Sequence, residues 1–454
     1  MSHRTDRVKT TLTIAVAALL LSGAGALPAA RAQDWPNWRG PQFNGSAPGA
    51  KNLPVKFSPT EGVKWAADMP GPSAATPAIY GDRVFVSSTD LKAETLVAIC
   101  LDRATGKERW RHAVGTGYMS GGEGNKIRRD ERSNYASPSP VTDGKRVVFF
   151  YGNGDLAAFD LDGKKLWQRN LQQDYGDFAF QWTFSSSPQL YNGKLYLQIL
   201  QRDRPIGGRG KADAPSFLLA LDPATGKEFW RQERPSPAVM ESREAFTTPI
   251  PHEHGGRKEL LIAGGDVVTG HDPETGKELW RWGTWNEDHR QGSWRLVPSP
   301  VAGDGIVLVC APKRAPVYAT KPGVGETKAA LAWKSEDRSA VSSDVPTPLF
   351  YEGKFYVLSD VRRALSCVEP KTGAVLWTAQ IPGRQMCWGS PTGADGKIYL
   401  LNLDGVVFVY DAAKGDLLAE NRMAEDGDDL RSSIAVAHGN LFLRTNSKLF
   451  CIGK

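Results

Sequence analysis

The chain has 454 residues, of which 41% are hydrophobic and 23% charged, and its formal net charge at pH 7 is +6. This small basic excess gives no reason to expect a nucleic-acid partner or an anionic membrane surface. The 47 glycines and 30 prolines predict many turns, and the scattered Trp, Tyr, Val and Leu residues suit short β-strands.

Residues 1–32 have the features of a secretory signal peptide rather than of a folded segment. Basic residues precede an apolar run over residues 11–21, and Ala30-Arg31-Ala32 offers a small-x-small cleavage site. The run is too short for a membrane span, and no cysteine follows it where a lipid anchor would attach. We therefore expect a periplasmic or secreted protein without a membrane span or a lipid anchor.

The next segment, residues 33–61, is expected to be an N-terminal extension that precedes the repeats. It opens with the sequence Asp-Trp-Pro-Asn-Trp-Arg-Gly-Pro over residues 34–41. From residue 62 onward the chain is periodic, and a repeat array can absorb this length in a single domain. We expect that domain to span residues 62–454.

The repeat is a degenerate motif, A-x-D-x-x-T-G-K-E-x-W. Its tryptophan recurs at intervals of 44 to 63 residues, at Trp110, Trp167, Trp230, Trp280, Trp333 and Trp377. The Asp can accept hydrogen bonds from the amides of its own turn and the Gly can take a positive φ, which predicts a hairpin. The Trp then lies on an outer strand, where it can wedge against the neighbouring unit. The copy at residues 319–333 keeps its Trp but has lost the turn signature.

A second signature precedes most copies: Ser/Thr-Pro, an apolar residue, a Gly turn and a β-rich run. Examples begin at Thr76, Ser187, Ser299, Thr347 and Ser390. Together the two signatures predict four antiparallel strands per unit, which is a propeller blade. The last unit supplies three strands before the chain ends, and Gly62-Val63-Lys64-Trp65 can supply the fourth, which would remove an open strand edge. The fold class is therefore all-β, an eight-bladed β-propeller closed by an N-terminal strand.

Five cysteines in an exported chain raise the question of disulfides. Cys100, Cys367 and Cys451 occupy one repeat position, two residues before the Asp position, where other copies have Ala or Gly. We interpret this position as a buried slot for a small side chain. The sequence leaves open whether Cys310 or Cys387 forms a disulfide, although the odd count leaves at least one thiol unpaired within the chain.

The repeat resembles the PQQ-type, quinoprotein-like propeller repeat over residues 62–453. The same repeat also builds the propeller lipoprotein of outer-membrane protein assembly, and residues 34–41 look like the start of exported PQQ-like propellers. The resemblance implies a fold and leaves the function open. Quinoprotein alcohol dehydrogenases carry an adjacent Cys-Cys pair, and this chain has neither such a pair nor a C-x-x-C-H haem motif. PQQ with calcium therefore remains an alternative rather than the expected cofactor.

The long links between units are where we expect any function, because loops on a rigid scaffold carry most binding sites. Aromatic, Arg and Asn side chains there suit a sugar, a quinone-like ring or a peptide, unless they fill the channel with packed rings and ion pairs. The candidate ligand-binding residues are Arg129, Arg132, Tyr135, Tyr175, Trp182, Arg243, Trp285, Asn286, Arg290, Trp294, Arg295, Arg384, Trp388 and Arg431.

Catalytic residues are harder to identify. His289 beside Asp288 and Glu287 is the best acid–base candidate, since His titrates near neutral pH. His252-x-His254, in the turn around Gly255-Gly256, has metal-binding spacing, but two ligands do not make a site. The leading hypothesis is an exported ligand-binding or protein-interaction scaffold for a glycan, a peptide or an exported partner protein at the channel mouth. The alternatives are a PQQ-dependent or sugar oxidoreductase and a carbohydrate-active lyase or hydrolase.

Overall fold

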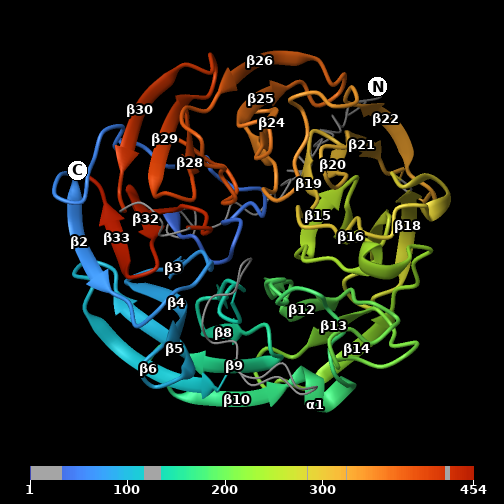
Figure 1. Cartoon of the computed structure of the whole chain (residues 1–454), viewed down its shortest axis with the longest axis horizontal. Coiled ribbons are helices and arrows are strands. Elements are labelled where there is room, and N and C mark those ends of the chain that lie inside the picture. Colours follow the sequence, from blue (N-terminus) through green and yellow to red (C-terminus); the bar gives the residue numbers. More distant parts are fainter. Residues whose placement is uncertain (2–32, 117–133, 284, 324, 425–429) are drawn as a thin grey trace.

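The computed structural model describes Met1 and residues 33–116, 134–283, 285–323, 325–424 and 430–454. Their strands form eight antiparallel sheets arranged around a central channel (Figure 1), and each sheet has four strands, apart from one that gains a fifth, parallel strand. The predicted eight-bladed β-propeller is confirmed. The predicted signal peptide, except for Met1, and the predicted arginines 129 and 132 lie outside the described residues.

Each of the first seven blades runs in chain order from a short strand at the channel to a strand on the perimeter. Blades 1 and 2 are β3 (Ala78–Tyr80), β4 (Arg83–Asp90), β5 (Thr95–Asp102), β6 (Glu108–Gly115) and β7 (Val141–Thr142), β8 (Arg146–Phe150), β9 (Asp155–Asp160), β10 (Lys165–Asn170). Blades 3 and 4 are β11 (Gln189–Tyr191), β12 (Lys194–Ile199), β13 (Phe217–Leu221), β14 (Glu228–Glu233) and β15 (Ile250–His254), β16 (Arg257–Gly264), β17 (Val267–His271), β18 (Glu278–Gly283).

The remaining blades follow the same pattern. Blades 5 and 6 are β19 (Val301–Gly303), β20 (Ile306–Cys310), β21 (Val317–Lys321), β22 (Ala330–Lys334) and β23 (Leu349–Tyr351), β24 (Lys354–Ser359), β25 (Ala364–Val368), β26 (Val375–Gln380). Blades 7 and 8 are β27 (Thr392–Ala394), β28 (Lys397–Leu401), β29 (Val406–Asp411), β30 (Leu417–Arg422) and β31 (Ala435–Ala437), β32 (Asn440–Arg444), β33 (Lys448–Ile452), with β2 (Val63–Asp68) completing blade 8.

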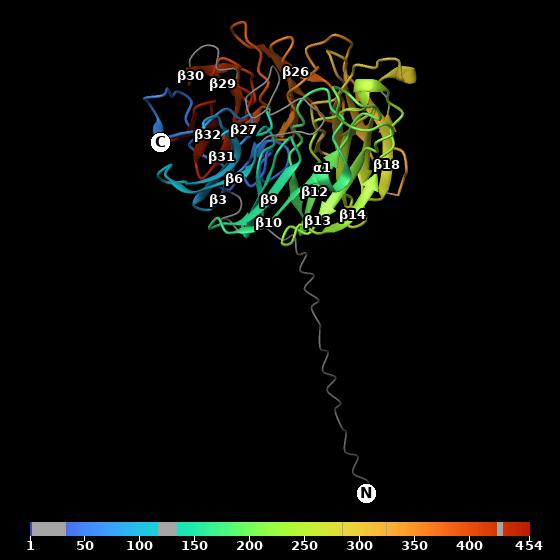
Figure 2. The ribbon, with the colours of Figure 1, turned by 60° about the horizontal axis from the view of Figure 1, so that its bottom comes forward.

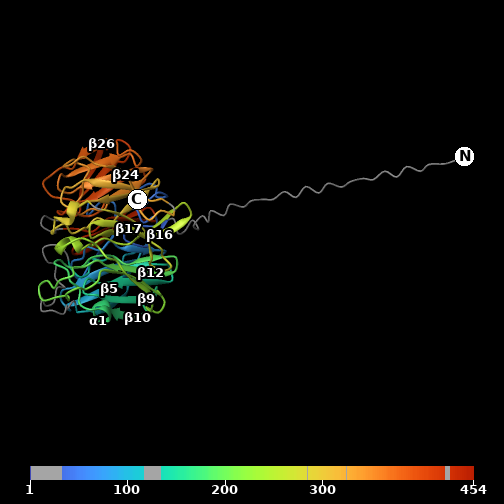
Figure 3. The ribbon, with the colours of Figure 1, turned by 90° about the vertical axis from the view of Figure 1, so that its right-hand side faces the viewer.

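The molecule is a thick disc with two different faces (Figures 2 and 3). The hairpin between the first two strands of a blade and the Asp-Thr-Gly hairpin lie together on one side, as the hydrogen bond from Arg103 N to Asp82 O (2.9 Å) illustrates in blade 1. We call this side the turn face. The links between blades lie on the opposite side, the link face, and include helix α1 (Leu171–Tyr175) and the 3₁₀ helices Met240–Arg243 and Glu287–His289.

The repeat motif forms the contact between neighbouring blades. In blade 3, for example, Asp222 accepts hydrogen bonds from its own turn, and the indole Nε1 of Trp167 in blade 2 donates to the carbonyl of Pro223 in that turn (3.0 Å). The turn glycine, Gly226, lies against the Trp167 ring with φ +71°. Trp65, Trp110, Trp230 and Trp333 dock on the next blade in the same way.

Trp280 departs from this arrangement because blade 5 lacks the Asp-Thr-Gly turn. Its ring packs inside its own blade against Gly270, and its Nε1 donates to the buried Glu259 carboxylate (2.7 Å) instead of a neighbouring turn. The seam between blades 4 and 5 therefore has no docked tryptophan of the usual kind.

The cysteines match their predicted structural role. Cys100, Cys367 and Cys451 each pair directly across the strand register with a docking tryptophan, respectively Trp110, Trp377 and Trp65. A small side chain there leaves room for the indole. All five cysteines are buried and free, which answers the question left open for Cys310 and Cys387.

The two ends of the chain close the ring as expected. Strand β2 pairs antiparallel with β33, and Trp65 of β2 docks on the turn of blade 1. Figure 1 shows β2, β33 and the C-terminus side by side. Among the described residues, no helix is long and apolar enough to cross a membrane.

The N-terminal extension crosses the turn face and covers the channel there. The Asp34 carboxylate accepts a hydrogen bond from Gly81 N in blade 1 and pairs with His438 in blade 8 (2.8 Å). Farther along, β1 (Ser46–Ala47) adds to β27 of blade 7 as a parallel strand. The extension also reaches blade 3, where the Phe43 ring packs edge-on against Tyr191 with 6.1 Å between the ring centroids. It therefore spans the ring and closes the turn-face end of the channel.

Candidate functional site

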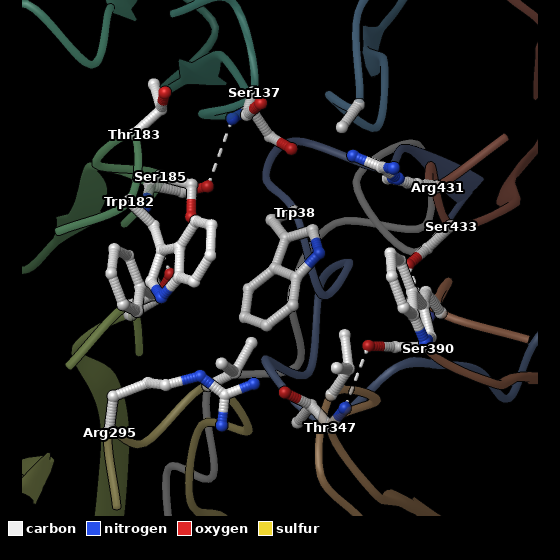
Figure 4. A pocket seen from close by; sticks show the side chains of 18 residues that line it. Trp38, Ser137, Trp182, Thr183, Ser185, Arg295, Thr347, Ser390, Arg431 and Ser433 are labelled. Carbon is white, nitrogen blue, oxygen red and sulfur yellow. Dashed lines mark hydrogen bonds between the residues drawn. The ribbon is translucent and has the colours of Figure 1, made fainter. Parts of the chain in front are cut away.

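A pocket of about 1000 Å³, including its open mouth, occupies the central channel (Figure 4). Four of the predicted binding residues, Trp182, Arg295, Trp388 and Arg431, line it together with Trp38. The first four come from four different links, so residues far apart in the sequence converge on one cavity. Figure 4 shows Trp38 at the centre of this group of side chains.

A closed ring of eight hydroxyl groups, which we call the hydroxyl belt, surrounds the channel, and six of its members line the pocket. One Ser or Thr from each blade accepts a hydrogen bond from the backbone N–H of the corresponding residue in the preceding blade, at donor–acceptor distances of 2.8 to 3.3 Å. The members are Thr76, Ser139, Ser187, Thr248, Ser299, Thr347, Ser390 and Ser433. All but Ser433 precede a proline. Proline favours an extended conformation in the residue before it.

The floor of the pocket comes from the N-terminal extension. Trp38 lines the pocket, and the next residue, Arg39, is fully buried. The Arg39 guanidinium donates to the carbonyls of Pro348 (2.8 Å) and Pro391 (3.1 Å) in two neighbouring blades, and burial lowers its pKa to about 9, so it stays charged at neutral pH. Arg39 thereby fixes the backbone that presents Trp38.

Two further indoles form the walls. Trp182 is held by a hydrogen bond from its Nε1 to the Glu241 carboxylate (3.0 Å). The guanidinium of Arg431 lies over the ring of Trp388, 4.9 Å from its centroid, in a cation–π contact. These contacts hold flat apolar surfaces beside polar groups, an arrangement that can stack a ring and bond its substituents.

Arg295 is fixed by a carboxylate behind it. Its two terminal nitrogens donate to the two oxygens of Asp344 (3.0 and 3.2 Å), a bidentate pair with well-defined geometry. Burial favours the neutral form of Asp344, but the hydrogen bonds from Arg295 outweigh this and hold the pKa of the carboxyl below its usual value. Asp344 N in turn donates to the buried Asp360 (3.1 Å), whose pKa burial raises to about 6.

Comparison with known proteins identifies the family. A family model described as outer membrane protein assembly factor BamB matches residues 54–197 and 317–452, which is more than half of the chain. The chain belongs to this BamB family. The predicted resemblance to PQQ-repeat propellers is thus confirmed.

Curated relatives of this BamB-family chain include dehydrogenases. It is 27% identical over 216 residues, 43% of this chain, to a polyvinylalcohol dehydrogenase of a Pseudomonas species, and 25% identical over 382 residues, 74% of this chain, to the quinohemoprotein alcohol dehydrogenase ADH IIB of Pseudomonas putida. These matches span 30% and 47% of the relatives' own lengths, so they carry no activity over to this chain by themselves.

Solved structures share the fold at low sequence identity. BamB from Moraxella catarrhalis superposes with a TM-score of 0.58 at 13% identity, covering 86% of this chain and 99% of that one. The quinohemoprotein alcohol dehydrogenase of Comamonas testosteroni gives 0.62 at 13% identity, covering 93% and 81%. One fold therefore accommodates both an assembly factor and a dehydrogenase, and only the site can separate them.

Several predicted binding residues of this BamB-family propeller are buried away from the pocket. Tyr135 and Trp285 belong to the hydrophobic cores of the blades. Asn286 is buried and donates to Asp266 (2.9 Å). Trp294 packs against the same core as Trp285. These side chains support the links and do not line the pocket.

Others lie toward the outside of the ring. Tyr175 donates to Glu228 on an outer strand (2.6 Å), and Arg243 pairs with Asp203 (3.0 Å) beside a separate pocket. Arg290 is an exposed partner of Glu287, and Arg384 is exposed with its carbonyl accepting from Arg363. None of these four lines the channel pocket.

The sequence placed the catalytic candidate His289 beside Asp288 and Glu287, but in the structure its partner is neither of these two residues. Its Nδ1 lies 3.0 Å from the carboxylate of the buried Asp266, while Glu287 pairs with Arg290. Asp288 has a strained φ of +51°. None of these residues lines the channel pocket.

The two histidines of His252-x-His254 form the end of β15, beside the turn, with their rings stacked at 6.1 Å. Burial lowers the pKa of His252 to about 4. In the part of the chain that the structure describes, no group of three His, Cys, Asp or Glu side chains could hold a metal ion.

Sequence reasoning missed two parts of the pocket. Trp38 and Arg39 were visible only as part of an opening motif, and their partners in blades 6 and 7 lie more than 300 residues away. The belt residues were visible in the sequence as the Ser/Thr-Pro pairs that precede the inner strands. The ring of hydrogen bonds that they form can be recognised only when the eight blades are arranged around the channel.

Proposed function

We propose that this chain is an exported propeller that binds a small ligand in its central channel, entered from the link face. The convergence of Trp182, Arg295, Trp388 and Arg431 on one pocket carries the proposal. These residues belong to four separate links, and packing of the blades alone does not require aromatic and guanidinium groups there. The N-terminal extension supports it further, because a closed end turns a channel into a pocket.

Binding rather than chemistry is what these side chains offer. The described lining residues are Trp, Phe, Val, Ala, Ser, Thr and Arg, and none of them is Asp, Glu, His, Lys or Cys. General acid–base catalysis needs a titratable group within hydrogen-bond reach of the reacting atom. Stacking on indole rings combined with hydrogen bonds from Arg, Ser and Thr suits recognition of a small cyclic molecule.

The test is equilibrium binding to the mature chain. A glycan array, PQQ and a set of aromatic acids would be screened, with tryptophan fluorescence and calorimetry as readouts. We expect at least one ligand whose dissociation constant rises tenfold or more in Trp182→Ala and in Trp388→Ala. Arg290→Ala, which changes an exposed ion pair outside the pocket, is the matched control and should leave binding unchanged. Ligands that bind all variants equally would refute a site in the channel.

A second candidate function is a quinone-dependent oxidoreductase. The 382-residue similarity to a quinohemoprotein alcohol dehydrogenase favours it. The indoles and arginines of the pocket fit a flat, carboxylated quinone such as PQQ. They do not fit the calcium ion that would accompany it, because calcium takes oxygen ligands, chiefly carboxylates, and no described lining residue is a carboxylate.

Reconstitution separates the two functions. The mature chain would be incubated with PQQ and Ca²⁺, and dye reduction would be followed with alcohols and sugars as substrates. Turnover that disappears in Trp182→Ala would favour the oxidoreductase. PQQ binding without any dye reduction would favour a binding protein and retire the oxidoreductase.

A further inference from the structure

Glu244 is a fully buried acid in the link between blades 3 and 4, and it does not itself line the pocket. Its two carboxylate oxygens accept from the backbone N–H of Gln181 (3.2 and 3.1 Å), and one of them also accepts from Nε of Arg202. Arg202 in turn donates from Nη2 to the side-chain oxygen of Gln181 (2.6 Å). Gln181 is therefore held by its backbone and by its side chain, and the next residue, Trp182, lines the pocket.

The backbone of Glu244 reaches two further walls of the pocket. Its carbonyl accepts from the N–H of Leu296 (3.1 Å), and the carbonyl of Leu296 accepts from the N–H of Phe246 (2.8 Å). Leu296 directly follows Arg295, and both Arg295 and Phe246 line the pocket. Pocket side chains from three successive links are thus tied to one residue that lies behind them.

Several charged side chains lie on the segments packed around Glu244. They are Arg202, Asp203 and Arg209 on the loop after β12, Glu241 and Arg243 on the link of Glu244 itself, and Arg295 on the next link. In the described part of the chain, only Arg202 forms an ion pair with the carboxylate. Burial raises the pKa of Glu244 to about 7, against the opposing effects of the Arg202 charge and of the hydrogen bonds from Arg202 and Gln181.

Protonation of Glu244 would change what its carboxyl can bind. An ionised carboxylate accepts hydrogen bonds and donates none, so it can bind the Gln181 amide and Arg202 at the same time. A protonated carboxyl carries an O–H that faces other donors, and it leaves the buried Arg202 without its counter-charge, which is costly. Protonation therefore weakens the hydrogen bonds that hold Gln181.

We propose that Glu244 is a positioning residue of the channel pocket, whose ionised carboxylate holds Trp182 in the pocket wall and whose protonation releases it. This inference rests on the proposed function, since it concerns the regulation of that same site. Glu244 does not contact the ligand and acts through Gln181. The affinity for a channel ligand should consequently fall as the pH falls through neutrality.

Fluorine NMR of the mature chain labelled with 5-fluorotryptophan tests the positioning without any ligand. The Trp182 resonance, identified by its loss in Trp182→Phe, should move with a midpoint near pH 7 in the wild type and should not do so in Glu244→Gln. Asp203→Asn is the matched control, because it breaks the neighbouring ion pair between the same two segments (3.0 Å). It should keep the transition. A wild-type resonance that does not move, or that moves equally in Glu244→Gln, would overturn the inference.

Arg202 provides a second pair of variants, which decides the question even if Glu244→Gln does not fold. The positive charge of Arg202 favours the ionised carboxylate. Arg202→Gln should therefore raise the pH of the midpoint, whereas Arg202→Lys, which keeps the charge, should leave it closer to the wild-type value. An unchanged or lower midpoint in Arg202→Gln would overturn the inference.

The effect on binding is measured by calorimetry with PQQ and with glycans at pH 6 and pH 8. We expect the affinity of the wild type to be at least threefold weaker at pH 6, and that of Glu244→Gln to be the same at both values. Equal affinities in the wild type would overturn the regulatory role. If none of these probes binds at either pH, the proposed function fails, while the fluorine resonance still decides whether Glu244 positions Trp182.

Discussion

At the scale of single residues, buried charges position the pocket. Arg39 carries a charge into the interior, where burying an ion without partners is costly. Carbonyls of Pro348, Pro391 and Asn44 accept its hydrogen bonds and offset that cost. Gly45 allows this approach, because a Cβ there would overlap the guanidinium of Arg39. One arginine thus ties the extension to two blades.

Asp360 leads to a prediction about pH. Burial raises its pKa to about 6, so between the unfolded pKa and pH 6 the folded state holds a proton that the unfolded state has lost. Stability must therefore fall as the pH rises through this window, by about 3 kcal/mol at most. Asp360→Asn keeps an oxygen to accept from Asp344 N without the charge. We expect this variant to match the wild type near pH 4 and to be more stable at pH 7.5 in chemical denaturation.

The control for this experiment is Asp337→Asn, which changes an exposed carboxylate. It should shift stability little at either pH. An Asp360→Asn chain that is less stable than the wild type at pH 7.5 would show that the ionised carboxylate contributes more through its hydrogen bonds than its burial costs.

At the scale of elements, each blade is joined to the next by a tryptophan against a turn glycine, which gives the second prediction. Gly226 and Gly193 belong to the same blade and both have positive φ (+71° and +77°). A Cβ on Gly226 would lie 2.7 Å from the Trp167 ring, whereas one on Gly193 would meet nothing within 4 Å. We expect Gly193→Ala to cost about 1 kcal/mol from backbone strain and Gly226→Ala about 2 kcal/mol more from overpacking.

Urea unfolding of the two variants measures the difference. Because both replace a glycine in a left-handed conformation, the strain cancels in the comparison. Equal losses for Gly226→Ala and Gly193→Ala would mean that the indole moves away at no cost, and that the docking contact adds little to stability.

The blades could be predicted from sequence because their signals are local. The Asp, Gly and Trp of one copy lie within about eleven residues of one another. A single degenerate copy would be weak evidence for a blade, but its recurrence along the chain makes the prediction specific. The links carry no such period. Tyr135 and Trp285 are aromatic like Trp388 and belong to similar links, yet they fill the blade cores while Trp388 lines the pocket. Residue type does not reveal which way a link side chain points, so the candidate site was predicted only in part.

At the scale of the whole molecule, strand β2 completes the blade that closes the ring, which gives the third prediction. A chain that begins at Gly62 keeps β2 and loses only the extension, while a chain that begins at Met69 also loses the partner of β33. An open edge of this kind invites pairing with other chains. We expect the first chain to elute as a monomer with one cooperative unfolding transition, and the second to associate or to unfold without cooperativity.

Size-exclusion chromatography and circular dichroism of the two truncated chains provide the measurement. Both lack Trp35, Trp38 and Arg39, so the loss of these buried residues is common to the two. If the chain without β2 were also monomeric and cooperative, the remaining contacts between blades 8 and 1, such as the belt bond from Ser433 N to Thr76, would suffice to close the ring.

The belt has one more consequence, which concerns direction. All eight N–H groups donate the same way around the axis, from each blade to the next along the chain and from blade 8 back to blade 1. The N–H···O dipoles therefore circulate around the axis and cancel. Because the bonds form a closed ring, no blade can move away from its neighbours without breaking the belt bond on each side of it, so we expect the eight belt amides to lose their protection from hydrogen exchange as a group.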